Sequence, residues 1–542
     1  MGTRPASRTL GDLLDEMAAA APHSEAVVFC QTRLDYAALK VSADEFARAL
    51  LAIGVRRGDR VALLITNRPE WLAAAFGAAK IGAIVAAIST FSTPRELGWA
   101  LEHSGATVLV TLDAFHGRNF IEALHELCPE FHTSEPGALH SDRLPELRAV
   151  ISIGETLPAG VYSLRAFLTR SAMIRAEAVA AAQRAVGAND VCYILYTSGS
   201  TAKPKGVMLA HGNVIANGFD IGERMHLGIA DRIWLAVPLF WSFGSANALP
   251  ATITHGGCLV LQETFEPSEA VALIEHEHCT VYYGMANMAR AMRDHPTHPG
   301  RRLGAMRTGL TIGPPDDIAM TIAAIGAEAL CNVYGSTETY GNCAVTDAND
   351  PLPVRLSSQG RPLPGMTVRA LDLEMRRPLP PGEIGELAVG GYITPGYYRA
   401  PELDATAFDA DGFFLTGDLG SIDPDGRIHF RGRLKEMIKT GGINVAPLEV
   451  EEVLLQHPDI VQAYVVGVPD MAKGEIVAAA VELRAGAEID GSAILAFCRE
   501  RLANYKVPMK LVLRSAADLP RTPTGKIHKR KLSQELATGA KA

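Results

Sequence analysis

The sequence lacks the cysteine patterns that would indicate a zinc site. Its eight cysteines are scattered between Cys30 and Cys498, with no C-x-x-C pair and no His/Cys cluster at metal-binding spacing. Cysteines in this arrangement are typical of small, mostly buried side chains in a reducing compartment. We therefore expect a cytoplasmic protein.

Long apolar runs and an excess of positive charge are also missing. Residues 73–88 are interrupted by Gly77, Lys80 and Gly82, so they predict a buried helix followed by a strand and no membrane span. No apolar run precedes Asp12, which argues against a secretory signal. A formal net charge of −9 over 542 residues argues against a general nucleic-acid binder.

Two common nucleotide-binding signatures are absent, because no Gly-Lys-Ser/Thr closes a Walker A loop and no Gly-x-Gly-x-x-Gly occurs. The chain does have a loop rich in hydroxyl groups, glycine and lysine at residues 196–207, Tyr-Thr-Ser-Gly-Ser-Thr-Ala-Lys-Pro-Lys-Gly-Val. Its N–H and O–H groups can converge on an anion, and Lys203 and Lys205 add positive charge. The pattern predicts a polyphosphate site, with a solvated surface loop as the alternative.

This loop closely resembles the phosphate-binding signature of the adenylate-forming superfamily, which contains acyl-CoA synthetases, adenylation domains of peptide synthetases and luciferases. Further motifs follow in the family's order: Tyr-Gly-Ser-Thr-Glu at 334–338, Gly-Glu-Leu at 385–387, Gly-Tyr-Tyr at 396–398, Thr-Gly-Asp at 416–418, Gly-Arg-Leu-Lys-Glu at 432–436, Gly-Gly at 441–442 and Arg-Thr-Pro-Thr-Gly-Lys at 521–526. The ordered set spans nearly the whole chain. It is most similar to a free-standing acyl-CoA synthetase.

Alternating helical and strand patterns predict an α/β fold with layered, mostly parallel sheets. Helical periodicity occurs at 10–21 and 36–53, and residues 191–196 predict a strand that ends at the phosphate loop. Ligands of α/β sheets bind at such carboxyl ends of strands. Residues 360–430, dense in turn residues, predict a more β-rich section.

A domain boundary is predicted at Leu434 and Lys435. It separates a large ATP- and acid-binding domain, residues 1–434, from a small mobile α/β domain, residues 435–542. The second domain has helical patterns at 447–455 and 492–502, and strand patterns at 460–468, 476–483 and 510–513. The resemblance implies that it rotates between two orientations. Lys529, Arg530 and Lys531 predict the solvated face of a terminal helix.

The resemblance implies an ATP-dependent carboxylic acid–CoA ligase. The acid first attacks the α-phosphorus of ATP to give acyl-AMP and pyrophosphate, and the thiol of CoA then displaces AMP. Because two negatively charged partners must meet, catalysis depends on positioning and charge neutralisation. The implied ATP and AMP contacts are Thr197, Ser198, Gly199, Ser200, Thr201, Lys205, Tyr334, Gly335, Asp418 and Arg433.

Individual roles follow from the resemblance. Glu338 is implied as the ligand of Mg²⁺, which accepts one carboxylate together with phosphate oxygens and water; Thr337 is implied as the hydroxyl at the α-phosphate. Tyr334 would face adenine, Asp418 would accept both ribose hydroxyls, and Arg433 would contact ribose and phosphate. An exposed charge, an ordinary aromatic and a turn aspartate are the alternatives for Glu338, Tyr334 and Asp418.

Three lysines are implied to act in the small domain. Lys526 would neutralise the acid and the α-phosphate in the first step, and Lys435 would be the hinge. Lys439 would act in the second step, although an exposed strand-edge lysine is an equal alternative. Gly441 and Gly442 would leave a tunnel for the pantetheine arm of CoA.

The acid pocket departs from the family pattern. Many relatives have histidine in a Pro-x-Phe-His segment, whereas residues 238–241 read Pro-Leu-Phe-Trp. The pocket candidates, each of which could equally be core, are Trp241, Tyr283, Met285, Gly313 and Tyr340. Because none of them is cationic, we expect an apolar monocarboxylic acid: aryl, alicyclic or medium-chain.

Two other functions stay open at this point. An acyl-AMP ligase that loads a carrier protein would keep every catalytic residue and change only the thiol acceptor. A non-catalytic nucleotide-binding protein is disfavoured, because Thr337, Glu338, Asp418, Arg433 and Lys526 are all present. We expect no nucleic-acid partner, and a monomer or a homodimer.

Overall fold

A computed structural model describes residues 9–154, 157–197, 204–298, 300, 302–440, 443–471, 473–522 and 526–538. Contacts divide the chain into two compact units. Unit 1 comprises Met1–Thr367 and Val389–Phe414, and unit 2 comprises Val368–Ala388 and Leu415–Ala542. A hinge is a property of motion and not of contact density, so the boundary at Leu434 and Lys435 stays a prediction.

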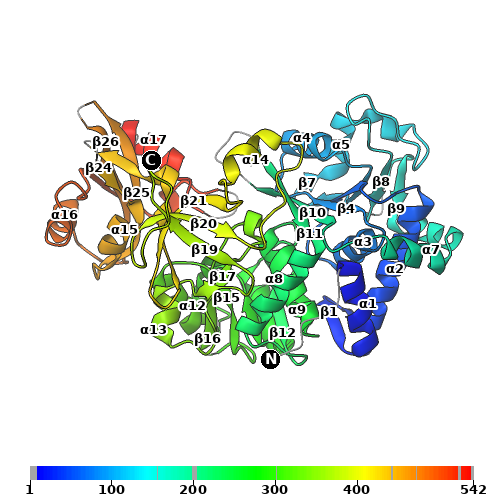
Figure 1. Cartoon of the computed structure of the whole chain (residues 1–542), viewed down its shortest axis with the longest axis horizontal. Coiled ribbons are helices and arrows are strands. Elements are labelled where there is room, and N and C mark those ends of the chain that lie inside the picture. Colours follow the sequence, from blue (N-terminus) through cyan, green and yellow to red (C-terminus); the bar gives the residue numbers. More distant parts are fainter. Residues whose placement is uncertain are drawn as a thin grey trace. The chain divides into compact units, whose positions relative to one another are not determined.

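Two large sheets form unit 1 (Figure 1). The first has the strand order β18-β17-β16-β15-β14-β12-β13-β1-β2 and is parallel from β16 to β1. Its strands are β1 (Glu25–Phe29), β2 (Thr32–Asp35), β12 (Arg232–Leu235), β13 (Cys258–Leu261), β14 (Val281–Tyr283), β15 (Thr308–Thr311), β16 (Ala329–Tyr334), β17 (Ala344–Val345) and β18 (Arg361–Pro362).

The second sheet has the order β11-β10-β4-β3-β5-β8-β9 and is parallel except for the edge pair β10 and β11. Its strands are β3 (Arg60–Leu64), β4 (Ile84–Ala87), β5 (Val108–Thr111), β8 (Ala149–Ser152), β9 (Val161–Ser163), β10 (Val191–Thr197) and β11 (Lys205–Ala210). A small hairpin, β6 (Ala114–Phe115) and β7 (Arg118–Asn119), lies outside both sheets.

Helices connect these strands, as expected for parallel sheets. The α-helices are α1 (Leu10–Ala20), α2 (Tyr36–Ala52), α3 (Pro69–Lys80), α4 (Pro94–Ser104), α5 (Phe120–Leu127), α6 (Leu164–Thr169), α7 (Ala176–Arg184), α8 (His211–Arg224), α9 (Leu249–Thr254), α10 (Pro267–His276), α11 (Ala286–Asp294), α12 (Pro315–Ile325), α13 (Leu352–Ser357) and α14 (Pro401–Ala407). Tighter or wider turns form η1 (Pro129–His132), η2 (Arg170–Met173), η3 (Phe243–Ala248, a π-helix) and η4 (Thr337–Thr339).

The sequence predictions for unit 1 are confirmed in outline. The expected helices at 10–21 and 36–53 are α1 and α2, and residues 73–88 form the end of α3 followed by β4. Seven of the eight cysteines are buried, whereas Cys30 is exposed. Among the described residues no helix is both long and apolar enough to cross a membrane.

Unit 2 contains most of a four-stranded sheet and the whole of a five-stranded sheet (Figure 1). The first sheet consists of β19 (Thr367–Leu371), β20 (Gly385–Gly390), β21 (Phe414–Ile422) and β22 (Ile428–Arg433). The second consists of β23 (Ile438–Thr440), β24 (Ile443–Val445), β25 (Ile460–Asp470), β26 (Gly474–Leu483) and β27 (Lys510–Leu513). The remaining elements are η5 (Leu434–Glu436), α15 (Pro447–Leu455), α16 (Gly491–Arg499), η6 (Ala516–Asp518) and α17 (Lys529–Thr538).

Both faces of the five-stranded sheet are covered. Val465 packs with residues of α15 and α16, whereas its neighbour Val466 packs with Leu532 and Leu536 of α17. Successive side chains of a strand point to opposite faces, so the apolar run at residues 463–468 of β25 is the pattern of a strand buried on both sides.

One sequence prediction is wrong in this unit. Lys529 does not lie on a solvated face, because its ammonium group is half-buried and pairs with Glu436 at 3.1 Å and with Glu451 at 3.0 Å. Arg530 and Lys531 are exposed, as predicted. Glu436 and Glu451 are distant in sequence, so the local charge run gave no sign of these partners.

Candidate functional site

The phosphate loop connects β10 with β11 at the edge of the seven-stranded sheet. Thr197, the last residue of β10, pairs with Lys205, the first residue of β11, and both side chains are half-buried. The loop therefore leaves the carboxyl end of a strand, as the sequence predicted. Its predicted contacts Ser198, Gly199, Ser200 and Thr201 lie outside the described residues.

The second motif begins where β16 ends. Tyr334 is buried at the end of this strand, Gly335 follows it, and Thr337 and Glu338 lie half-buried in the short helix η4. The carbonyl of Glu338 accepts a hydrogen bond from the backbone N–H of Thr394 at 2.7 Å. A turn held in this way presents its hydroxyl and carboxylate groups in a fixed direction.

Glu338 and Lys205 approach the same aromatic side chain. The phenol of Tyr397 donates to the carboxylate of Glu338 at 2.9 Å, and the Lys205 ammonium lies 4.9 Å from the centre of the Tyr397 ring. Two residues predicted to act on phosphate and magnesium are thus brought together, although they are distant in sequence.

The segment at Trp241, where the sequence differs from the family pattern, lies next to the same turn. The hydroxyl of Ser242 lies 3.2 Å from the hydroxyl of Thr337. Trp241 itself is half-buried, with its ring 5.7 Å from that of Phe240 and 6.4 Å from that of Phe91. An aromatic wall therefore begins one residue from the hydroxyl that meets Thr337.

The other acid-pocket candidates differ in exposure. Tyr283 is fully buried, with its ring 4.6 Å from that of Phe243. Tyr340 is fully buried, its hydroxyl accepts from the N–H of Ala210 at 2.9 Å, and burial raises its pKa to about 12. Met285 and Gly313 are half-buried.

The turn after Glu338 has a left-handed backbone. Tyr340 has φ 60° and Gly341 has φ 92°, and a Cβ at Gly341 would lie 1.9 Å from the Asn247 side-chain oxygen. Asn247 donates to the carbonyl of Tyr340 at 2.6 Å and to Asn217 at 3.0 Å. Only glycine satisfies both the conformation and the space at this position.

Unit 2 contains the predicted ribose contacts. Asp418 and Arg433 are cross-strand neighbours in β21 and β22, and their side chains form an ion pair at 2.8 Å. Asp418 is buried, whereas the Arg433 side chain is 45% exposed. The Glu386 carboxylate accepts from the N–H of Gly417 at 3.0 Å and so anchors the part of β21 that precedes Asp418.

The three lysines that the sequence predicts to act in unit 2 are exposed. Lys435 lies in η5, Lys439 lies in β23, and Lys526 lies just before Ile527, which bridges to Arg521. Partial desolvation and the positive charge of Arg433 lower the pKa of Lys526. Gly441 and Gly442 lie outside the described residues.

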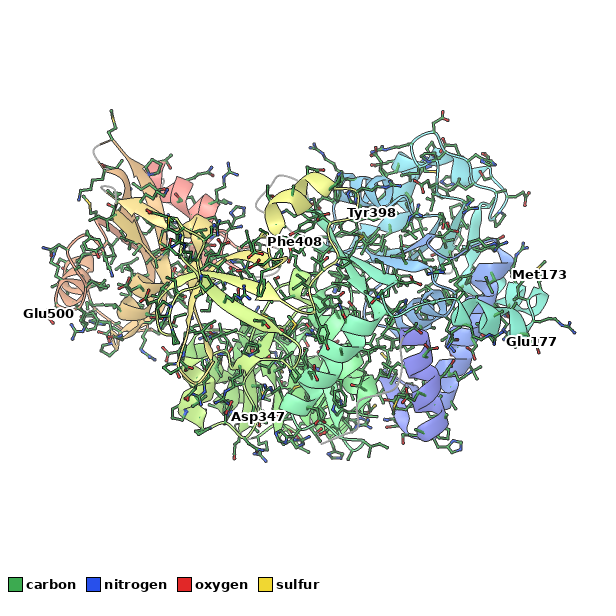
Figure 2. All side chains as sticks on the ribbon, in the orientation of Figure 1. Met173, Glu177, Asp347, Tyr398, Phe408 and Glu500 are labelled. Atoms are coloured by element: carbon green, nitrogen blue, oxygen red, sulfur yellow. The ribbon has the colours of Figure 1, made fainter. Side chains whose placement is uncertain are left out.

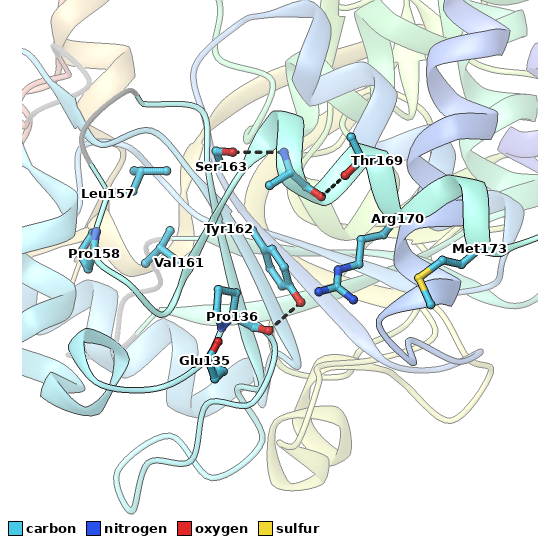
Figure 3. Close-up of a pocket in the computed structure, with 11 residues that line it drawn as sticks. Glu135, Pro136, Leu157, Pro158, Val161, Tyr162, Ser163, Thr169, Arg170 and Met173 are labelled. Atoms are coloured by element: carbon cyan, nitrogen blue, oxygen red, sulfur yellow. Dashed lines mark hydrogen bonds between the residues drawn. The ribbon is translucent and has the colours of Figure 1, made fainter.

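A separate pocket of about 780 Å³ opens on unit 1 (Figure 3). It is lined by Glu135, Pro136, Leu157, Pro158, Val161, Tyr162, Ser163, Ala166, Thr169, Arg170 and Met173. The guanidinium of Arg170 lies 5.2 Å from the centre of the Tyr162 ring, and the Tyr162 hydroxyl donates to the carbonyl of Pro136 at 2.6 Å. None of the predicted ATP, metal or acid contacts is among its lining residues.

Sequence reasoning missed the contacts that join these motifs. Tyr397 lies in the Gly-Tyr-Tyr motif at 396–398, but the motif alone predicts no contact with Glu338, and Ser242, Asn247 and Phe91 lie outside the motifs. Only Ser242 had a usable signal, because it directly follows the tryptophan at which the sequence departs from the family pattern.

Comparison with known proteins shows the family of the chain. The model of the AMP-binding enzyme family matches residues 14–398, and the model of the C-terminal domain of these enzymes matches residues 449–526. The YngI protein of Bacillus subtilis is 34% identical over 533 residues, which cover 97% of each chain.

Two further comparisons cover nearly the whole chain. The human mitochondrial medium-chain acyl-CoA ligase ACSF2 is 31% identical over 544 residues, which cover 98% of this chain and 88% of that ligase. The ATP-bound crystal structure of MatB from Rhodopseudomonas palustris has a TM-score of 0.82 at 27% identity, and covers 98% of this chain and 100% of MatB. The chain therefore belongs to the AMP-binding enzyme family, the adenylate-forming superfamily indicated by its ordered motifs, and is one of its acyl-CoA synthetases.

Proposed function

We propose that this synthetase activates an apolar monocarboxylic acid, with a medium-chain fatty acid as the preferred substrate. The observation that carries the proposal is the junction at Trp241 and Ser242. Ser242 meets Thr337 at 3.2 Å, so an acid packed against Trp241 and Phe91 would place its carboxylate beside the hydroxyl proposed for the α-phosphate. The medium-chain specificity named for ACSF2 supports the same substrate class.

The walls around this junction favour hydrocarbon. Phe91, Phe240 and Trp241 form one aromatic group, and Phe243, two residues further along the chain, packs on Tyr283. Aromatic faces bury a large apolar area and exclude water. A mixed anhydride of acid and phosphate is hydrolysed by water, so a dry wall also protects the intermediate.

In the proposed first step, a carboxylate oxygen of the acid attacks the α-phosphorus and pyrophosphate leaves. Thr337 donates its hydroxyl to the α-phosphate, and Lys205 and Thr197 bind the phosphates that leave. Lys526 lies between the two anions and offsets their repulsion during attack. Asp418 and Arg433 bind the ribose, and Tyr334 lies against the adenine.

Glu338 fits the role of a magnesium ligand. Its carboxylate is half-buried and oriented by the Tyr397 phenol. Within the described ranges no group of three or more His, Cys, Asp or Glu side chains could hold a metal alone, which suits an ion bound mainly by phosphate oxygens and water. Bound Mg²⁺ would supply charge neutralisation at the phosphates.

In the proposed second step, the thiol of CoA attacks the acyl carbonyl and AMP leaves. Lys435 is the proposed hinge, and rotation about it exchanges Lys526 for Lys439 with Gly441 and Gly442. A Lys435→Pro substitution removes the backbone freedom needed for rotation, because proline fixes φ. Acid-dependent pyrophosphate–ATP exchange should persist while thioester formation stops; unimpaired thioester formation would remove Lys435 from the hinge role.

An acid panel tests the substrate class. We would measure kcat/KM for pyrophosphate release with Mg²⁺ and CoA present, using butyric, hexanoic, octanoic, dodecanoic, benzoic, cyclohexanecarboxylic and succinic acids. The proposal expects the maximum at hexanoic or octanoic acid and the minimum at succinic acid. A maximum at succinic acid would contradict the apolar pocket, and a maximum at benzoic or cyclohexanecarboxylic acid would replace the medium chain with a ring.

The acceptor is tested in the same assay. Acyl-CoA should form when CoA is supplied, and a purified acyl carrier protein should not replace it. Thioester formed on the carrier and not on CoA would overturn the CoA acceptor while leaving the adenylation step unchanged.

A further inference from the structure

Tyr397 is anchored by backbone contacts on both sides. It pairs with Val207 of β11 in an antiparallel bridge, the N–H of Tyr398 donates to the carbonyl of Gly206 at 2.8 Å, and the N–H of Met208 donates to the carbonyl of Gly396 at 3.2 Å. Tyr397 is only 4% exposed. Its position is therefore fixed relative to the strand that follows the phosphate loop.

The Tyr397 side chain contacts two charges of opposite sign. Its hydroxyl donates to Glu338 at 2.9 Å, and its ring face lies 4.9 Å from the ammonium of Lys205. The negative face of an aromatic ring attracts a cation, whereas the hydroxyl hydrogen attracts an anion. One side chain thus binds both groups through different atoms.

This arrangement leaves the two charges separate. In the part of the chain that the structure describes, no ion pair joins Glu338 directly to Lys205. A direct pair would satisfy each charge with the other and compete with metal and phosphate. Contact through a neutral tyrosine orients both groups, and neither charge is neutralised by the other.

Tyr397 keeps its proton while it does so. An ordinary tyrosine phenol has a pKa of about 10, so at neutral pH the hydroxyl carries its proton and donates to Glu338. The hydroxyl therefore remains a donor at any ordinary working pH, and the contact does not depend on a titration.

We propose that Tyr397 is a positioning residue that holds Glu338 ready for Mg²⁺ through its hydroxyl and Lys205 ready for phosphate through its ring. The proposal rests on the proposed roles of Glu338 and Lys205. It assigns the residue two separable functions, each carried by a different part of the side chain.

The two parts can be removed in turn. Tyr397→Phe deletes the hydroxyl and keeps the ring. The Mg²⁺ concentration that gives half-maximal pyrophosphate release should rise about tenfold, which is the lower end of the range expected when a group that orients a metal ligand is lost. Tyr397→Leu also deletes the ring, and should weaken ATP binding in EDTA about fivefold, as expected for one lost cation–π contact.

The neighbouring Tyr398 is a matched control. Tyr398, which is labelled in Figure 2, directly follows Tyr397 in the sequence, but its ring contacts His103 and the guanidinium of Arg399. Tyr398→Phe removes the same hydroxyl group one residue away. It should leave both the Mg²⁺ requirement and ATP binding in EDTA unchanged.

The experiment uses the full chain with octanoic acid, CoA and ATP. Mg²⁺ is titrated in the activity assay, and the Kd of ATP is measured by calorimetry in EDTA and in excess MgCl₂. Melting temperatures are recorded for every variant. The calorimetric measurement reports the binding of ATP independently of turnover.

A Glu338→Gln variant distinguishes failure of the proposed metal role of Glu338 from failure of the proposed positioning role of Tyr397. If this variant has the wild-type Mg²⁺ requirement, the metal role of Glu338 is wrong and the proposed site fails. If Glu338→Gln raises the requirement while Tyr397→Phe does not, the site stands and the positioning role of Tyr397 is overturned. A Tyr397→Phe protein with lower melting temperature and equal losses in all readouts also overturns it, because that is the behaviour of a core residue.

Discussion

The two units hold their proposed catalytic charges in different ways. In unit 1, Glu338 and Lys205 are half-buried and share contacts with one buried tyrosine. In unit 2, Lys526, Lys435 and Lys439 are exposed, whereas Asp418 and Arg433 form an ion pair. The groups proposed to bind metal and phosphate are thus fixed in position within unit 1, whereas the proposed catalytic lysines of unit 2 lie at its surface.

This contrast fits a division of labour between the units. Groups that bind a phosphate throughout the reaction benefit from a rigid position, since no reorganisation is needed when charge develops. A lysine that serves one step and is then withdrawn must not be tied to its own unit. The predictions below test the contrast, beginning with the largest effect.

The largest effect is expected at Lys526. Lys526→Ala should reduce acid-dependent pyrophosphate–ATP exchange by about a hundredfold to a thousandfold, as expected for one lost preorganised charge contact. Thioester formation from supplied acyl adenylate and CoA should stay within a few-fold of wild type. Lys531→Ala, an exposed lysine of the same unit, is the control; equal losses in both half-reactions would contradict a role limited to one step.

The next effect concerns the acid sensitivity of unit 1. His211 is fully buried, its Nδ1 accepts from the N–H of Leu10 at 3.2 Å, and burial lowers its pKa to about 4. An unfolded histidine has a pKa of about 6.5, so below that pH the unfolded state binds the proton first. Stability should therefore fall between about pH 6.5 and pH 4, by roughly 3 kcal/mol in total.

Tryptophan fluorescence measures this effect in one unit only. The four tryptophans, Trp71, Trp99, Trp234 and Trp241, all belong to unit 1. Urea unfolding followed by fluorescence at pH 7 and pH 5 should show the loss, and His211→Asn, which keeps an acceptor for Leu10, should reduce it. An identical pH dependence in His211→Asn would assign the sensitivity to other groups.

A smaller effect is expected at Trp241. Trp241→Ala should shift the ratio of kcat/KM values toward bulkier acids by about tenfold and increase release of free acyl adenylate, because it removes a wall of the proposed pocket. Phe265→Ala, which removes an aromatic ring packed on Trp234, is the comparison. If Trp241→Ala lowers the melting temperature sharply and leaves the acid profile unchanged, Trp241 is a core residue.

The smallest effect tests the fixed pairs of unit 2. Lys529→Met should lower the stability of this unit by about 1 kcal/mol, because the buried Glu451 loses its cation, whereas Lys531→Met should change it by less than about 0.5 kcal/mol. Hydrogen exchange in β25 reports this unit. Equal protection in the two variants would show that the Lys529 pairs contribute nothing measurable.

Much of the fold could be predicted because its signals are local. The periodicities that define α1, α2 and α15, and the apolar runs that define β26 and β27, lie within single elements. The phosphate loop could be placed for the same reason, since its composition and the preceding strand are contiguous.

Contacts between distant segments could not be predicted from those signals. Tyr397 and Glu338 are 59 residues apart, and they meet because the segment at Gly396 pairs with β11. The position of Phe91 against Trp241 and of Lys529 against Glu451 likewise depends on how whole elements pack. The motifs identified which residues matter, whereas the packing decides which of them touch.

The π-helix η3 follows Trp241 and sets how the side chains on either side of it are oriented. Ser242 meets Thr337 and Asn247 meets Tyr340, so two groups five positions apart face the same turn. In an α-helix, five residues would rotate these groups about 140° apart, whereas in a π-helix residues at this spacing lie nearly above one another. Deleting one residue between them would change the angular phase and turn one group away. Simultaneous contact of Ser242 and Asn247 with the turn at 337–340 therefore depends on the number of residues between them.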